Sequence, residues 1–167
     1  AETDPVLDLQ FSINHVDADD IEELTGERLL SEALQGAVSM SGGLDALVIN
    51  GELGSPSGGG SLGFGVQLNT AVDPMPWEVE LKPNGLDVHT LTPLVTEVTR
   101  LNGVLTAAGK GTEYPEGVSA TISGDLNDQI IQGHAVDSLT LEAMLNQGVL
   151  SIEHLGFNGN GINAELE

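Results

Sequence analysis

The feature that most constrains this chain is a regular alternation of apolar and polar residues. Between residues 7 and 14, every apolar residue is followed by a polar one. The same period of two returns in later stretches, at residues 61–69, 77–82, 118–122, 139–145, 150–152 and 162–166. A period of two places the apolar side chains of a strand on one face. About ten strands of this kind, separated by turns rich in Gly, Asn and Pro, predict a mostly β, antiparallel protein.

Two stretches break the alternation, and each predicts a short helix. Residues 17–24 (DADDIEEL) place acidic side chains in what would be the first helical turn. Residues 90–100 (TLTPLVTEVTR) carry Pro93 at an early helical position and an apolar stripe. Helices this short are not stable alone, so we expect both to pack on the sheet.

The composition excludes several classes of protein. With 4 Lys+Arg against 26 Asp+Glu, the chain cannot neutralise a run of phosphates, so we expect no nucleic-acid partner. The absence of cysteine rules out disulfides, a thiolate nucleophile and Cys-ligated metal. No apolar run approaches the roughly 20 residues that a membrane-spanning helix needs. At 40% hydrophobic residues, however, the chain has enough apolar material for a sizeable core.

The net charge of -22 admits two interpretations. Self-repulsion at this density destabilises a compact state unless salt screens it, which would suit a high-salt habitat. Alternatively, the charge is simply that of a soluble acidic surface.

No sequence motif indicates catalysis or a cofactor. Residues 58–63 (GGGSLG) match the dinucleotide-binding pattern formally, but an alternating strand follows where a helix is required. The acidic run from Asp17 has Glu22 and Arg28 where a calcium loop needs Gly and Glu. The four histidines lie far apart, and no serine has a convincing base partner. We therefore predict no catalytic residues, no metal site, no cofactor and no enzymatic activity.

An internal repeat organises the chain. Residues 14–24 (NHVDADDIEEL) are similar in pattern to residues 84–94 (NGLDVHTLTPL), and residues 34–43 (LQGAVSMSGG) to residues 101–111 (LNGVLTAAGKG). These similarities predict units of approximately 6–69 and 77–145, with 146–167 starting further strands. A unit that recurs in one sheet predicts an elongated, additive structure. Because the sequence ends within a strand pattern (INAELE), we expect residues 1–167 to be a single segment of a longer β structure.

The apolar stripe itself has two interpretations. It can form the core of a β-sandwich that a second sheet seals. It can also form the apolar inner face of a curved sheet that lines a groove for an apolar ligand. The alternation alone does not separate them.

Residues 76–111 (PWEVELKPNGLDVHTLTPLVTEVTRLNGVLTAAGKG) resemble the AsmA-like / TamB family of bacterial envelope proteins. In that family a strand opening with Trp leads to an "L-D" helix and then to "L-x-G-x-L-x-x-x-G". Residues 29–53 and 139–161 are similar to the same pattern. The resemblance implies a long β-taco groove whose apolar interior holds acyl chains. It further implies proteins that are anchored in the inner membrane, bridge the periplasm and take part in phospholipid transfer.

For this chain, the resemblance implies a groove segment located in the periplasm or cell envelope. Its expected partners are phospholipid acyl chains and an outer-membrane barrel protein, which would dock through regions outside this fragment. The resemblance also implies a role in outer-membrane protein assembly. Open sheet edges are further expected to let the fragment self-associate. The family does not require the extreme acidity. The main alternative is a structural or adhesive β-solenoid segment of an exported surface protein with a sealed core. A glycan-binding or glycan-processing domain is a weaker alternative, because the chain has only five aromatic residues.

The residues expected to line the lipid groove are the apolar members of the alternating stretches. They are Leu7, Leu9, Phe11, Ile13, Leu62, Phe64, Val66, Leu68, Trp77, Val79, Leu81, Val118, Ile122, Leu141, Leu145 and Ile152.

Overall fold

The computed structural model describes residues 6–43, 45–111 and 117–166, and its dominant element is one antiparallel sheet. The strands are β1 (Leu7–Val16), β2 (Leu34–Gly42), β3 (Leu47–Gly54), β4 (Ser61–Leu68), β5 (Pro76–Asn84), β6 (Leu86–Asp87), β7 (Arg100–Leu101), β8 (Gly103–Lys110), β9 (Ser119–Ile131), β10 (His134–Asn146), β11 (Val149–Gly159) and β12 (Ile162–Leu166). The prediction of a mostly β, antiparallel protein with two short helices is confirmed.

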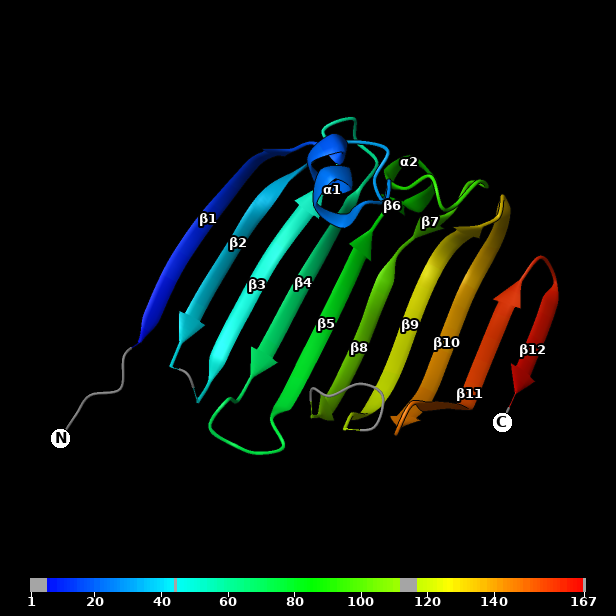
Figure 1. Cartoon of the computed structure of the whole chain (residues 1–167). Helices are drawn as coiled ribbons and strands as arrows, with labels where there is room; N and C mark the ends of the chain where they lie inside the picture. Colours follow the sequence, from blue (N-terminus) through cyan, green and yellow to red (C-terminus); the bar gives the residue numbers. More distant parts are fainter. Residues whose placement is uncertain (1–5, 44, 112–116, 167) are drawn as a thin grey trace.

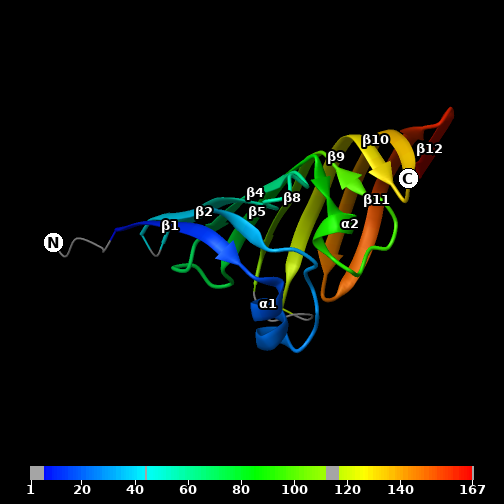
Figure 2. The same cartoon turned by 90° about the horizontal axis from the view of Figure 1, so that it is seen from above.

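The order of the strands in the sheet follows their order in the chain. The path runs β1-β2-β3-β4-β5-β8-β9-β10-β11-β12, and the two-residue strands β6 and β7 lie off it, with β7 pairing with β6 and β9. Figure 1 shows these strands in one layer, from β1 at one edge to β12 at the other. Seen from above in Figure 2, the layer is twisted, as sheets of L-residues are.

The strand register aligns the apolar residues of all ten strands of this path. Residues that pair across antiparallel strands point to the same face, so successive pairs define rows that cross the sheet. The central row consists of Phe11, Val38, Gly51, Phe64, Leu81, Leu105, Gly124, Leu141, Leu155 and Leu166. We call the side that carries this row and its apolar neighbours two residues away the apolar face.

The opposite side of the sheet is polar. The neighbouring row there consists of Gln10, Ser39, Asn50, Gly65, Glu80, Thr106, Ser123, Glu142 and His154. The period of two in the sequence therefore becomes two faces of opposite character, and we call the second the polar face.

The apolar face is not covered by a second layer in the part of the chain that the structure describes. Besides Pro83, only six apolar side chains of the described residues are buried, and three of them are alanines: Ala18, Leu86, Ala120, Leu126, Val136 and Ala143. Most members of the apolar face are half-buried. The expected sizeable buried core is thus absent from the described residues, because a single sheet shields each apolar side chain only by its neighbours.

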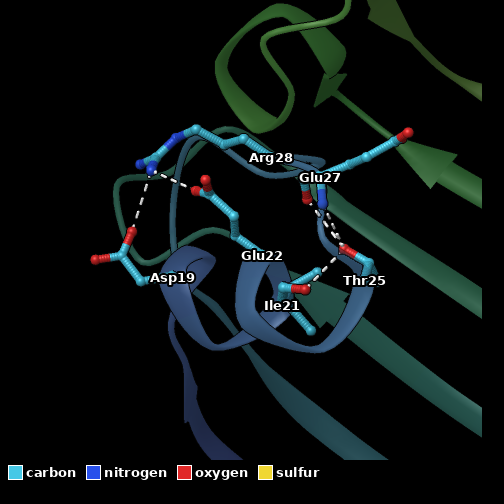
Figure 3. A network of polar contacts seen from close by, with 6 residues as sticks. All are labelled: Asp19, Ile21, Glu22, Thr25, Glu27 and Arg28. Carbon is cyan, nitrogen blue, oxygen red and sulfur yellow. Dashed lines mark hydrogen bonds and ion pairs between the residues drawn. The ribbon is translucent and has the colours of Figure 1, made fainter.

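Helix α1 (Ala18–Thr25) confirms the helix predicted for residues 17–24 to within one residue. It ends at Gly26, whose φ of 75° lets its N–H donate to the carbonyl of Glu22. Figure 3 shows Arg28 folding back over the helix, with Nη1 at 3.1 Å from Asp19 Oδ1 and 3.0 Å from Glu22 Oε2. In Figures 1 and 2 the helix stands on one side of the sheet, at the end where β3 finishes.

The helix predicted for residues 90–100 is wrong. Helix α2 is only Val88–Leu91, and Thr92 is already extended, with φ -137° and ψ 137°. The ring of Pro93 clashes with a helical conformation at the preceding residue, which explains why the helix ends there. Leu94 is 73% exposed and Val98 43% exposed, so the expected apolar stripe does not pack on the sheet.

The two predicted repeat units share one local path. In each, a long strand leads to a helix and the chain returns as an antiparallel neighbour of that strand, β1 to β2 around α1 and β5 to β8 around α2. Both helices stand at the same end of the sheet (Figure 1). The units of approximately 6–69 and 77–145 remain a prediction.

Candidate functional site

The candidate site is the apolar face, and glycines shape its surface. A Cβ added to Gly51 would lie 2.4 Å from Phe64 Cζ, and one added to Gly109 would lie 2.8 Å from Trp77 Cζ2. Large side chains therefore lie over glycines of the neighbouring strand. The polar atom of the tryptophan is satisfied at the margin of the face, because Trp77 Nε1 donates to the carbonyl of Gly111 at 3.0 Å. The result is a surface of large apolar groups held close to the sheet.

The register places all but one of the predicted lining residues in the strands of the apolar face. These are Leu7, Leu9, Phe11 and Ile13 of β1, Leu62, Phe64, Val66 and Leu68 of β4, Trp77, Val79 and Leu81 of β5, Ile122 of β9, Leu141 and Leu145 of β10, and Ile152 of β11. Val118 lies just before β9, where its carbonyl accepts a hydrogen bond from the Gln147 N–H at 3.2 Å.

Sequence reasoning missed the part of the face that β2, β3 and β8 supply. Val38, Met40, Ile49 and Leu105 lie in rows with the predicted residues. Glycines and alanines interrupt the apolar alternation in these strands, which hid their contribution. The signal that could have identified this part of the face is the alternation in β2, where Val38 and Met40 are separated and flanked by Ala37, Ser39 and Ser41.

Exposure of the apolar face increases toward the edges of the sheet. Phe11 in β1 is 52% exposed, and Ile152 in β11 and Ile162 in β12 are 48% and 60% exposed. Isolated exposed apolar side chains are common, but a contiguous apolar surface of this extent marks a binding surface or an aggregation hazard. In this structure the face is an open surface, and its enclosure into a groove remains a prediction.

The polar face carries a separate hollow of about 380 Å³ beside β9, β10 and β11. Thr106 and Ser123 share a hydrogen bond of 2.6 Å there, and Thr140 Oγ1 lies 3.3 Å from His154 Nε2. His154 Nδ1 is 3.6 Å from Glu165 Oε1. The walls of this hollow combine these polar groups and the carboxylates of Asp125 and Glu142 with the apolar residues Val104 and Leu141.

A second polar network fixes the end of the sheet at which the helices stand. The carboxylate of Glu32 accepts hydrogen bonds from the hydroxyls of Ser55 and Ser57. These two hydrogen bonds lower the pKa of Glu32 below the usual value for a glutamate. The network ties the connection that precedes β2 to the loop that follows β3.

Among residues 6–43, 45–111 and 117–166, no group of three or more His, Cys, Asp or Glu side chains is placed to hold a metal ion. Neither helix described in the structure has the length and apolar character required to cross a bilayer.

The fold and the face define a class of protein, namely an open antiparallel β-sheet with one apolar and one polar side. Comparisons of the chain with family models, curated proteins and solved structures gave no match.

Proposed function

We propose that this chain is a segment of an envelope-spanning lipid-transfer bridge whose apolar face holds phospholipid acyl chains between the inner and outer membranes. One observation carries the proposal. The apolar face crosses ten strands without a charged residue in its central row, and most of its side chains are at most half-buried. Such a surface needs an apolar partner in water, and an acyl chain has the matching shape and chemistry.

The physical basis of binding is burial of methylene groups. Each CH₂ removed from water contributes about 0.8 kcal/mol, so a long acyl chain gains several kcal/mol after ordering costs. Because the apolar rows change little in character from β1 to β12, an acyl chain moves across the sheet with little net change in free energy. The mechanism requires no reaction and no cofactor.

The distribution of charge supports the same proposal. The polar face directs carboxylates such as Glu80 and Glu142 away from the bound chain, into water. With a net charge of -22, this exterior repels anionic membrane surfaces while the lipid moves. Docking to an outer-membrane barrel protein, and a contribution to outer-membrane protein assembly, belong to this proposal through regions outside residues 1–167.

The first test is native purification followed by solvent extraction and mass spectrometry of the extract. We expect phospholipid in near-stoichiometric amounts. A clean extract together with no uptake of a fluorescent acyl probe would favour the competing function, a structural or adhesive segment whose apolar face is sealed. The half-buried state of the face favours lipid binding over that alternative.

The second test places a charge on either side of one strand. Val66→Asp introduces a carboxylate in the middle of the apolar face, where a bound acyl chain would have to desolvate it, and we expect uptake of the acyl probe to fall strongly. Gln67→Asp, one residue further along β4, places the same group on the polar face and should leave uptake unchanged. Undiminished uptake by a folded Val66→Asp protein, judged by circular dichroism, would contradict the proposal.

A further inference from the structure

The sequence contains five Asn-Gly pairs, and the structure places one of them differently from the rest. The pairs begin at Asn50, Asn84, Asn102, Asn158 and Asn160. Asparagine is a chemically labile residue. A following glycine makes it more so, because glycine has no Cβ to shield its backbone nitrogen from the side-chain amide or to restrict the backbone. All the pairs share this local chemistry, so a difference in their reactivity has to come from the fold.

Four of the pairs are held by the sheet. Asn50–Gly51 lies inside β3, between β2 and β4. Gly103 is paired in the ladder of β8 with β9, and Gly159 in the ladder of β11 with β12. Gly85 follows β5, and its N–H donates to Asn102 Oδ1 at 2.6 Å. The Asn102 amide group also donates to a backbone carbonyl of β9 at 3.0 Å. The backbone at these pairs cannot rotate without the loss of these contacts.

The fifth pair is the turn between β11 and β12, at one edge of the sheet (Figure 1). Asn160 and Gly161 have φ of 52° and 74°, as both central residues of a type I′ turn do. The last strand pair is Gly159 with Ile162, so neither turn residue belongs to the ladder. Both are exposed, and a Cβ at Gly161 would meet nothing within 4 Å. Opening this turn therefore disrupts fewer contacts than opening any of the strand pairs.

We propose that Asn160 is a site of spontaneous covalent modification, at which the asparagine converts to aspartate and isoaspartate. The backbone nitrogen of Gly161 loses its proton to solvent hydroxide and attacks Cγ of Asn160. The new N–Cγ bond forms, the Cγ–Nδ2 bond breaks, and the amide group takes up a proton and leaves as ammonia. One water molecule then opens the cyclic imide at either of its carbonyls, which gives aspartate or isoaspartate. The reaction requires only water and hydroxide.

The isoaspartate product changes the sheet as well as the charge. Its backbone runs through the side-chain methylene, so the turn gains one backbone atom, and a type I′ turn that fixes the strand register cannot absorb it. Strand β12 pairs only with β11, so we expect this strand alone to be released. It carries Ile162 and Leu166 of the apolar face, which are 60% and 57% exposed. The modification therefore narrows the apolar face by one strand. This inference does not rest on the proposed function.

The experiment compares the Asn-Gly pairs within one molecule. The folded chain is incubated at mildly alkaline pH, and tandem mass spectrometry measures the conversion of each asparagine over time. We expect Asn160 to react at least about tenfold faster than any other site, which corresponds to about 1.4 kcal/mol in the free energy of local opening. The control is the same incubation in urea, where the fold no longer protects any site and the rates should become similar. Faster or equal reaction of another Asn-Gly pair in the folded chain would overturn the proposal.

A second measurement tests the release of β12. The isoaspartate form is separated by chromatography, and hydrogen exchange of the β12 amides is compared with that of the unmodified chain. We expect the protection of these amides to be lost. Asn160→Asp is the matched control, because it adds the same charge with a normal backbone and Asp-Gly also favours a type I′ turn. This variant should keep its protection. Protected β12 amides in the isoaspartate form, or equal loss in Asn160→Asp, would show that the altered backbone does not release the strand.

Discussion

At the scale of single residues, the contact between Gly51 and Phe64 shows how the apolar face is built. The aromatic ring occupies the space where a side chain at position 51 would stand, and Ala37 O lies 2.9 Å from the same point. The ring therefore gains contact with the backbone of β3, and the cost is a glycine in the middle of a strand.

Gly51→Ala should consequently destabilise the protein by about 1–3 kcal/mol, because the new methyl group must displace the Phe64 ring. Gly65→Ala is the control. Gly65 is the cross-strand partner of Asn50 on the polar face, where an added Cβ would meet only Asn50 Oδ1, at 3.2 Å. That variant should be close to neutral. Urea unfolding of both variants measures the difference, and an equal loss in both would show that ring placement over Gly51 contributes nothing.

The sequence predicts residues on the apolar face well and residues in the end loops poorly. A period of two is a local property, so Leu62 or Val79 can be placed on a face without knowledge of the partner strand. The proximity of Asp87 and Arg100 depends instead on the pairing of β6 with β7 across thirteen positions. No local pattern carries that information.

At the scale of elements, the Glu32 network links two connections that lie far apart in the sequence. The hydroxyls of Ser55 and Ser57 stabilise the ionised carboxylate, and the pKa of Glu32 is lowered for that reason. A lowered pKa in the folded state means a contribution to stability that is present above the usual glutamate pKa. This contribution is lost as the pH falls through the lowered value.

Ser57→Ala should raise the pKa of Glu32 toward that of an ordinary glutamate, because it removes one of the two hydrogen bonds to the carboxylate. The measurement is a pH titration of the side-chain carboxyl carbon by ¹³C NMR. Ser31→Ala, an exposed position in the same connection, should leave the titration unchanged. An identical midpoint in wild type and Ser57→Ala would mean that the serine does not tie the loop to Glu32 in solution.

The two helices show which elements local rules predict. Helix α1 has an extended residue, Asp17, before it and Gly26 after it, and the predicted bounds of 17–24 differ from the observed ones by one residue at each end. In residues 90–100, Pro93 was compatible with an early helical position, but the helix had already begun at Val88. The same proline therefore fell beyond its end and stopped it. The boundary was set by contacts of Asp87 and Val88 with Gly59 and Thr99, which local propensity does not contain.

At the scale of the whole molecule, charge opposes the fold. The chain has 26 acidic and 4 basic side chains, and three of the basic ones, Arg28, Lys82 and Arg100, form ion pairs with carboxylates. The remaining carboxylates repel one another across a thin sheet with few buried apolar groups. Screening by salt should relieve this repulsion.

We therefore expect the urea midpoint to rise steadily from low salt to molar potassium chloride at pH 7. The control is the same series near pH 4, where the carboxylates are partly protonated and the rise should be much smaller. A midpoint independent of salt at pH 7 would show that the acidic surface is tolerated without screening, and would remove the physical basis for a high-salt habitat.

The strand order has a consequence for how such a protein changes in evolution. Apart from β6 and β7, every strand pairs with the strands before and after it in the chain, so each hairpin depends only on its immediate neighbours. Duplication or deletion of a hairpin lengthens or shortens the sheet without altering the connections of the rest. The width of the apolar surface is therefore set by the number of hairpins that the gene encodes. Selection can change this number while the fold stays the same.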